Sequence, residues 1–290
     1  MRRLRSEPGR DSLLRRVRRQ QVKYITILPS LVTILNGVCG FASIVFASKG
    51  AKAGVADFSY FAIAGYMILL AMIADMLDGR LARMSHSTSS FGGQLDSLCD
   101  AISFGVAPAF LMLKILDHKL AAIGFGNDVF MQRFIWLAGA AYMSCAAIRL
   151  ARFNVENDQD ESAHMNFVGL PSPAAAGVIV SLVIFHQETL PQADIVIYVL
   201  PFVALVIAIL MVSRIRYPHL LNQYLHGKKP FAYLLRALLL LGLIVVSWQS
   251  ALVLVFCGFA ASSFLNWFYN RVLRRRQPLA EQATIYEPQQ

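Results

Sequence analysis

Long apolar segments constrain this sequence more than any other feature. Each is close to the roughly 20 residues that a helix needs to cross a bilayer. The eight segments are 28–48, 57–83, 93–117, 131–153, 172–190, 193–213, 231–248 and 250–270. Because backbone amides in lipid must be hydrogen-bonded within their own segment, helix is the secondary structure that fits. The sequence therefore predicts an all-α, polytopic membrane helix bundle with about eight transmembrane helices, and Pro108 and Pro201 are expected to kink their spans.

The composition excludes the class of soluble nucleic-acid-binding proteins. Apolar residues make up 57% of the chain and charged residues 15%, against about 45–50% and 25% in soluble domains. The net charge of +10 comes from Lys and Arg at the chain ends and in short connectors, as is typical beside membranes. Cys39, Cys99, Cys145 and Cys257 lie in apolar segments and are expected to be buried rather than disulfide-bonded.

The distribution of basic residues predicts the orientation of the bundle. An even number of spans places both chain ends, and every second connector, on one side of the membrane. That side carries 21 Lys and Arg, nine of them within residues 1–23, whereas the other side carries five. The positive-inside rule then predicts a basic cytoplasmic arm over 1–27 and a polar cytoplasmic tail over 272–290.

Four aspartates lie within 26 residues, where one predicted span ends and the next begins. Asp75 and Asp78 are three residues apart, and Asp96 and Asp100 are four apart, so each pair shares one helix face. The short connector makes the two helices antiparallel neighbours, and the pairs are expected to face each other at the cytoplasmic boundary. Ionisable residues in spans are costly and by default mark a functional site.

These carboxylates predict a metal site. Carboxylates gathered in a low-dielectric setting require cations, and oxygen ligands suit Mg²⁺, Mn²⁺ or Ca²⁺ rather than zinc. We expect Asp75, Asp78, Asp96 and Asp100 to hold two ions, which balance four carboxylates and clamp a phosphoryl group. Carboxylates paired with arginines, or an ion pathway, are the alternatives.

The residues around the aspartates suit a phosphate ligand. Gly79 and Ala82 lack bulk, so a ligand can approach the backbone. Arg83 offers a cationic fork for phosphate oxygens, and Gly92 lies one turn before the third aspartate. Small residues interleaved with all four carboxylates favour a ligand site over structural ion pairs.

The segment from Asp75 to Asp100 resembles, position for position, the signature of the CDP-alcohol phosphatidyltransferase family, D-x2-D-G-x2-A-R-x8-G-x3-D-x3-D. The resemblance implies a six-helix core over 28–213, two metal ions (Mg²⁺ or Mn²⁺) and a CDP-lipid donor, here CDP-diacylglycerol. It implies that Asp100 is the general base for an acceptor alcohol. It further implies a homodimer. The last two apolar segments lie outside the resemblance and predict two additional transmembrane helices in 214–271, and we expect the protein in a bacterial cytoplasmic membrane.

Other segments are similar to the membrane-bound, serine-accepting branch of this family; they are 28–36, 94–108, 149–154 and 167–176. This similarity implies L-serine as the acceptor. Serine carries a carboxylate, which Arg149 or Arg152 can bind, since both lie level with the aspartates at the end of the fourth predicted span. Membrane anchoring and a phosphate contact on the CDP-lipid are alternatives for both arginines.

Two polar residues of the first span and two rival functions complete the expectations. Thr33 and Asn36 lie one turn apart, and are expected to contact the CDP-lipid or to form a helix–helix hydrogen bond.

The first rival function is the same family reaction with glycerol 3-phosphate, inositol phosphate or choline as acceptor. A cation transporter is the other, and it would place the carboxylates at mid-membrane.

Overall fold

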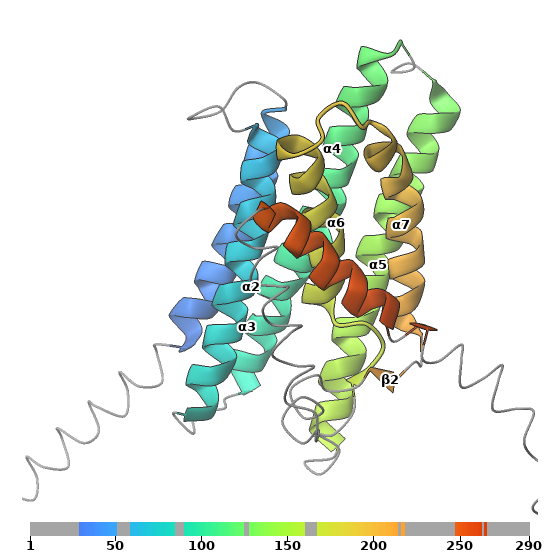
Figure 1. The fold of residues 1–290 in the computed structure, drawn as a ribbon. Helices are drawn as coiled ribbons and strands as arrows, with labels where there is room; N and C mark the ends of the chain where they lie inside the picture. Colours follow the sequence, from blue (N-terminus) through green and yellow to red (C-terminus); the bar gives the residue numbers. More distant parts are fainter. Residues whose placement is uncertain are drawn as a thin grey trace, which may run out of the picture.

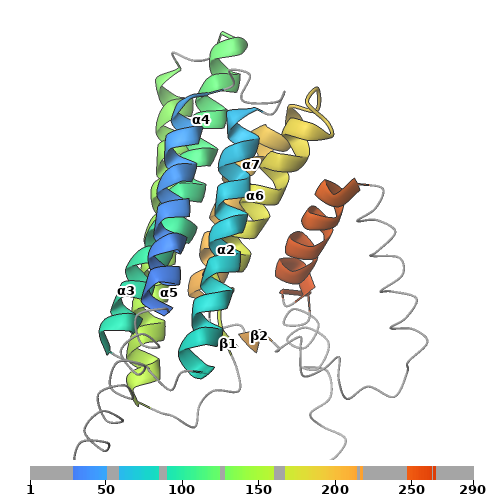
Figure 2. The ribbon, with the colours of Figure 1, turned by 90° about the vertical axis from the view of Figure 1, so that its left-hand side faces the viewer.

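The computed structural model describes residues 29–50, 59–84, 90–124, 128–159, 167–213, 216–217, 247–262 and 264–265. These residues form a bundle of long helices that run side by side (Figures 1 and 2). In chain order the helices are Pro29–Ser48, α2 (Tyr60–Met84), α3 (Ser90–Asp100), the π-helix η2 (Ala101–Val106), α4 (Ala107–Ala122), α5 (Val129–Gln159), α6 (Ser172–Glu188), α7 (Ile195–Val212) and Ser247–Ser262. The all-α prediction is confirmed, apart from two paired two-residue strands, β1 (Phe167–Val168) and β2 (Arg216–Tyr217).

The predicted count of eight spans is not confirmed. Among the described residues, five helices are long and apolar enough to cross a membrane: Pro29–Ser48, Tyr60–Leu81, Phe91–Ala122, Val129–Val155 and Ile195–Val212. The predicted span 172–190 corresponds to α6, which has 17 residues and falls just short of this length. Almost all of the predicted span 231–248 lies outside the described residues, and 250–270 overlaps the short apolar helix Ser247–Ser262.

A π-helical turn interrupts the third span next to its proline. The helix widens over Ala101–Val106, immediately after Asp100, and α4 then begins with Pro108 in its first turn. Proline has no backbone N–H, so it cannot bond the carbonyl four residues earlier, which belongs to Phe104. The buried hydroxyl of Tyr142 donates to that carbonyl at 3.0 Å instead. The proline expected to kink the span thus coincides with a change of helix type beside a predicted site residue.

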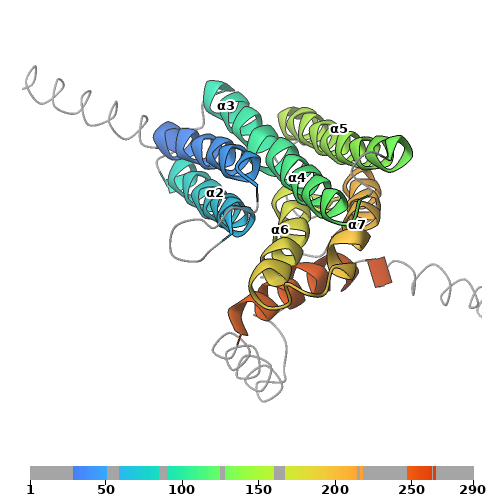
Figure 3. The ribbon, with the colours of Figure 1, turned by 90° about the horizontal axis from the view of Figure 1, so that it is seen from above.

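Small residues allow the Pro29–Ser48 helix to lie against the α3–η2 segment. A Cβ atom added at Gly37 would lie 2.9 Å from Cys99 Sγ, and one added at Gly40 would lie 2.7 Å from Ser103 Cα. Real Cβ atoms do not approach other atoms so closely, so the two backbones are in direct contact at this crossing. This contact holds the first helix beside α3, as Figure 3 shows from above, and α3 carries the second pair of aspartates.

Gly40→Ala is therefore expected to destabilise the protein by about 1–3 kcal/mol, because its methyl group meets the Cα atom of Ser103 as well as its side chain, and the backbone atom cannot rotate away. Thermal melting of the purified protein in detergent measures the loss. Gly258→Ala is the matched control, since a Cβ there meets nothing within 4 Å. Equal melting temperatures for the two variants would contradict the close crossing.

Polar contacts join the helices at the end of the bundle opposite the aspartates. Lys119 Nζ lies 2.5 Å from Asp194 Oδ1, and the buried His186 Nε2 lies 3.3 Å from the same oxygen. The hydrogen bond from Lys119 holds the pKa of the Asp194 carboxyl below its ordinary value. The Tyr66 hydroxyl donates to Glu188 at 2.5 Å, which joins α2 to α6. These contacts clamp the ends of α2, α4, α6 and α7.

The last described helix packs across α6 at Gly177, where an added Cβ would overlap the ring of Phe256. In Figure 1 this helix crosses the bundle obliquely, which differs from the upright path of the other helices. The chain entering α6 is held by Gly169, whose φ of +87° is suited to glycine and whose position leaves no room for a side chain beside the Met211 carbonyl. These contacts position the start of α6 beside the end of α7.

Candidate active site

The structure brings the carboxylates of two helices together. Asp75 and Asp78, near the end of α2, and Asp96, in α3, each offer an oxygen atom, and these three atoms lie within 4.8 Å of one another. Asp78 is only 4% exposed. The i, i+3 spacing and the short connector predicted this convergence, and it lies at one end of the α2 and α3 spans rather than at their middle.

The three-aspartate group has the chemistry of a divalent-cation site. Asp78 Oδ2 and Asp96 Oδ1 are buried and have no hydrogen-bond partner within the described part of the chain. A buried carboxylate oxygen without a partner costs free energy, which a cation at that position would offset. Oxygen ligands in this number suit Mg²⁺, Mn²⁺ or Ca²⁺. The residues present therefore fit a hard divalent metal.

Asp100 lies one helical turn after Asp96 and is not one of the three residues whose oxygens converge. It is 8% exposed, and its Oδ1 accepts a hydrogen bond from Nδ2 of the fully buried Asn36 at 2.9 Å. The helix–helix hydrogen bond, one of the two alternatives for Asn36, is thus observed. Thr33 is also buried, and its hydroxyl donates to the Pro29 carbonyl at 3.0 Å within its own helix. Asp100 is therefore held by the first helix, while its role in metal binding or proton transfer stays a prediction.

The predicted CDP-lipid contacts lie around the carboxylates on α2 and α3. Gly79 is exposed, and a Cβ added there would meet nothing within 4 Å. Packing does not explain this glycine, so the open space beside it is available to a ligand. Gly92 is half-buried near the start of α3, whereas the side chains of Ala82 and Arg83 lie outside the described residues.

Arg149, on α5, lies next to Asp100. The two helices are antiparallel, and Asn154 Nδ2 donates to Ser97 Oγ at 2.8 Å, which places Arg149 about one helical turn further along, level with Asp100. The Arg149 Nη1 group donates to the hydroxyl of Ser172 at the start of α6. Its Nε is buried and without a partner among the described residues. A cationic donor group is therefore available beside the carboxylates.

The other predicted acceptor residue, Arg152, is half-buried on α5. Sequence reasoning did not single out Ser172 or Asn154, although both lie in segments that carry the family resemblance. No spacing signal identified them, because their contacts join α6 to α5 and α5 to α3. A serine at the first turn of a helix is usually predicted to cap that helix. Here the Ser172 hydroxyl accepts a hydrogen bond from Arg149 instead.

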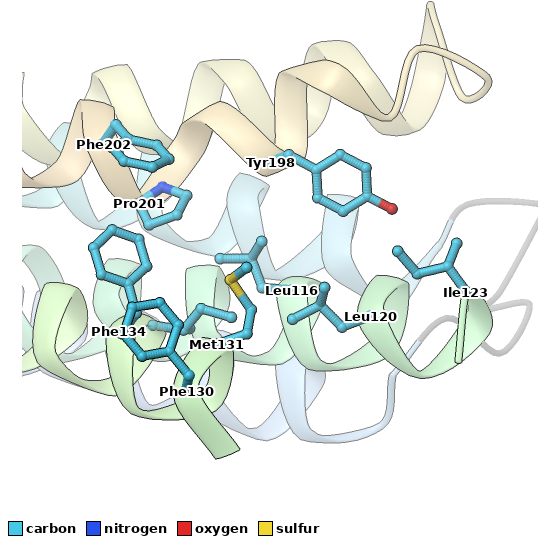
Figure 4. Close-up of a pocket in the computed structure, with 10 residues that line it drawn as sticks. Leu116, Leu120, Ile123, Phe130, Met131, Phe134, Tyr198, Pro201 and Phe202 are labelled. Atoms are coloured by element: carbon cyan, nitrogen blue, oxygen red, sulfur yellow. The ribbon is translucent and has the colours of Figure 1, made fainter. Parts of the chain in front are cut away.

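A separate apolar pocket of about 550 Å³ lies between α4, α5 and α7. Figure 4 shows its lining, which includes Leu116, Leu120, Phe134, Tyr198 and Phe202. The pocket is at the far end of the continuous α3–η2–α4 helix from Asp96, at least 20 residues along it or about 30 Å away at 1.5 Å per residue. Its lining has no Asp, Glu, Lys, Arg or His and lies far from the aspartates, so it takes no part in their chemistry.

Comparison with known proteins identifies the family. The family model of CDP-alcohol phosphatidyltransferases matches residues 26–213. The chain belongs to the CDP-alcohol phosphatidyltransferase family.

Several curated relatives carry the printed name CDP-diacylglycerol–serine O-phosphatidyltransferase. The protein of that name from Helicobacter pylori is 33% identical over 195 residues, which cover 67% of this chain and 72% of the relative. Its namesake from Methanocaldococcus jannaschii is 31% identical over 202 residues, covering 70% and 79%. The namesake from Saccharomyces cerevisiae is 38% identical over 158 residues, covering 52% and 51%.

Proposed function

We propose that this protein is an integral membrane enzyme that transfers the phosphatidyl group of CDP-diacylglycerol to L-serine, giving phosphatidylserine and CMP. The observation that carries the proposal is the group of three carboxylates from two helices, two of whose oxygens are buried without partners, beside a fourth carboxylate held by an amide. Relatives named for this reaction, in bacteria, an archaeon and yeast, support the choice of donor and acceptor.

The aspartates of α2 and α3 would hold the metal, proposed to be two ions of Mg²⁺ or Mn²⁺. Bound there, divalent ions neutralise charge on a diphosphate and on its leaving phosphate. Asp75, Asp78 and Asp96 supply the ligand oxygens, and Asp100 is the fourth proposed ligand. The open space beside Gly79 admits the diphosphate to the backbone of α2. Thr33, Ala82, Arg83 and Gly92 are the further proposed CDP-lipid contacts.

Asp100 is the proposed general base. Its carboxylate accepts the proton of the serine hydroxyl, whose oxygen attacks the phosphorus nearest the diacylglycerol, and the bond from that phosphorus to CMP breaks. Arg149 lies beside Asp100 with a buried N–H group to offer, so it can bind the serine carboxylate while the hydroxyl faces the base. Arg152 is the second candidate for that contact.

The acceptor assay tests the proposal directly. Purified protein with Mg²⁺ or Mn²⁺ is incubated with CDP-diacylglycerol and, separately, L-serine, glycerol 3-phosphate, inositol phosphate or choline. CMP release and the lipid product are measured. Of these four alcohols, we expect only serine to give CMP, together with phosphatidylserine as the lipid product. CMP release with another alcohol and none with serine would reassign the acceptor, and no CMP with any of them would rule out the reaction.

Arg149→Lys is expected to raise the apparent KM for serine roughly 10- to 100-fold, because losing one charge-assisted hydrogen bond costs about 1.5–3 kcal/mol. The KM for CDP-diacylglycerol should change little. Arg133→Lys, an exposed position at the other end of the same helix, is the matched control. A rise confined to the KM for CDP-diacylglycerol would instead assign Arg149 to the donor phosphate.

We further propose that both termini and the aspartates face the cytoplasm, that the membrane is bacterial and that the protein is a homodimer. The excess of basic residues on one side of the predicted spans supports the orientation. It is tested by placing single cysteines in the connectors between helices and measuring their labelling in intact cells. Cross-linking in native membranes tests the dimer. The division into an arm (1–27), a core (28–213), two further helices (214–271) and a tail (272–290) stays a prediction.

A further inference from the structure

Asn36 makes two contacts to the segment that carries Asp100. Its side-chain Nδ2 donates to Asp100 Oδ1 at 2.9 Å, and its backbone carbonyl accepts a hydrogen bond from Ser103 Oγ at 2.9 Å. Asn36 is fully buried, so bulk solvent does not compete for either bond. A single residue of the first helix thus grips the end of α3 and the start of the π-helix.

The backbone around Asn36 has little freedom to move. Gly37 and Gly40 lie against Cys99 and Ser103 with no room for a side chain. The helix axis is therefore fixed relative to α3, and the amide of Asn36 reaches Asp100 from a set position. A hydrogen bond from a fixed donor restricts rotation of the carboxylate about its Cβ–Cγ bond, so the place of the second oxygen, Oδ2, is set as well.

The oxygen atom of the Asn36 amide indicates that the contact with Asp100 has a role beyond packing. Asn36 Oδ1 is buried and has no partner among the described residues, which leaves an uncompensated polar atom in the bundle. Buried orphan groups of this kind are uncommon and often mark functional sites. The reverse orientation of the amide would set its oxygen against the carboxylate, so the donor contact to Asp100 determines which way the amide points.

We propose that Asn36 is a positioning residue for the reaction, which acts by holding the Asp100 carboxylate at the orientation needed for proton transfer from the acceptor hydroxyl. This inference rests on the proposed function. It assigns the Asn36 side chain to a contact with the proposed general base, Asp100, and not to a contact with the nucleotide. Loss of the amide should therefore change turnover without changing how tightly the donor lipid and the metal bind.

The test compares purified wild-type protein with Asn36→Ala and Asn36→Asp in detergent, using CDP-diacylglycerol, serine and Mn²⁺. For Asn36→Ala we expect kcat to fall about 100-fold, the loss that a misplacement of about 1 Å can cause. Apparent KM values and the Mn²⁺ affinity measured by calorimetry should stay within about threefold. Asn36→Asp has nearly the same shape but lacks the donor, so it should lose at least as much turnover.

Ser43→Ala is the matched control, because Ser43 is fully buried on the same helix and its hydroxyl has no partner in the described structure. Wild-type kcat in either Asn36 variant would overturn the proposal. So would parallel losses of melting temperature, Mn²⁺ affinity and donor affinity, which indicate a structural or nucleotide-binding role. If the wild type uses another alcohol, the serine assignment fails, and the same kcat ratio is measured with that alcohol. If the wild type releases no CMP with any alcohol, both the proposed function and the proposed role of Asn36 are wrong.

Discussion

Asp100→Asn is expected to lower turnover by about 10²- to 10⁴-fold, the range that a positioned general base contributes. The amide has the shape of the carboxylate, and its oxygen can still accept the hydrogen bond from Asn36 that Asp100 accepts at 2.9 Å. It cannot accept a proton from the serine hydroxyl. The fold and the binding of CDP-diacylglycerol should therefore survive while CMP release is lost, as activity assays and calorimetry of the same preparation would measure.

Asp117→Asn serves as the control for this variant. The Asp117 side chain is 42% exposed at the far end of the same continuous helix, where it pairs with Lys114 at 3.8 Å, and it should tolerate the change. Near-normal turnover of Asp100→Asn would refute the assignment of the base. A loss of Mn²⁺ affinity in Asp100→Asn as large as in the other aspartate variants, with turnover that recovers at high metal concentration, would show that Asp100 serves as a metal ligand only and not as the base.

Asp96→Ala is expected to weaken Mg²⁺ or Mn²⁺ binding by at least about 100-fold, since even the outer partners of metal ligands are worth 10- to 100-fold in affinity. Asp96 contributes a buried oxygen without a partner to the three-aspartate group. Removing it leaves one carboxylate fewer to balance the cation charge. Activity should fall with the metal affinity and recover in part when the metal concentration is raised, which Asp100→Asn should not do.

Calorimetric titration of the metal into purified protein measures the effect, and Asp117→Ala is the control that removes one carboxylate elsewhere. If Asp96→Ala binds Mn²⁺ as tightly as the wild type, the three aspartates are not a metal site. The same titration on Asp75→Ala and Asp78→Ala shows whether the group acts as a unit. Unequal losses would identify which oxygens carry the ion.

The aspartate group could be predicted from local rules. Helical spacing puts Asp75 and Asp78 on one face, and a short connector brings Asp96 to the same end of the bundle, so little beyond helix geometry is needed. The partner of Asp100 could not be predicted in the same way. Asn36 is 64 residues away, and its two possible roles, a nucleotide contact and a helix–helix bond, are indistinguishable until the rotation of the first helix is known.

The π-helical turn and the contact of Arg149 with Ser172 could not be predicted either, because each involves a partner on another helix. Pro108 indicated a break in the third span, but the partner of the Phe104 carbonyl that the proline cannot bond is the hydroxyl of Tyr142, which comes from another helix. Ser172 resembled a helix cap until α5 and α6 were placed side by side. In each case the deciding group lies on a different helix.

Apolar segment length, proline positions and the spacing of the aspartates determined by themselves that this chain is a membrane helix bundle with a carboxylate site at one end, because solvation and helix periodicity act within a single segment. Tertiary structure alone decided the rotation and depth of each helix. Close backbone contact at Gly37 and Gly40 sets them for the first helix. Lipid solvates every apolar face equally well, so packing and buried hydrogen bonds select which faces meet.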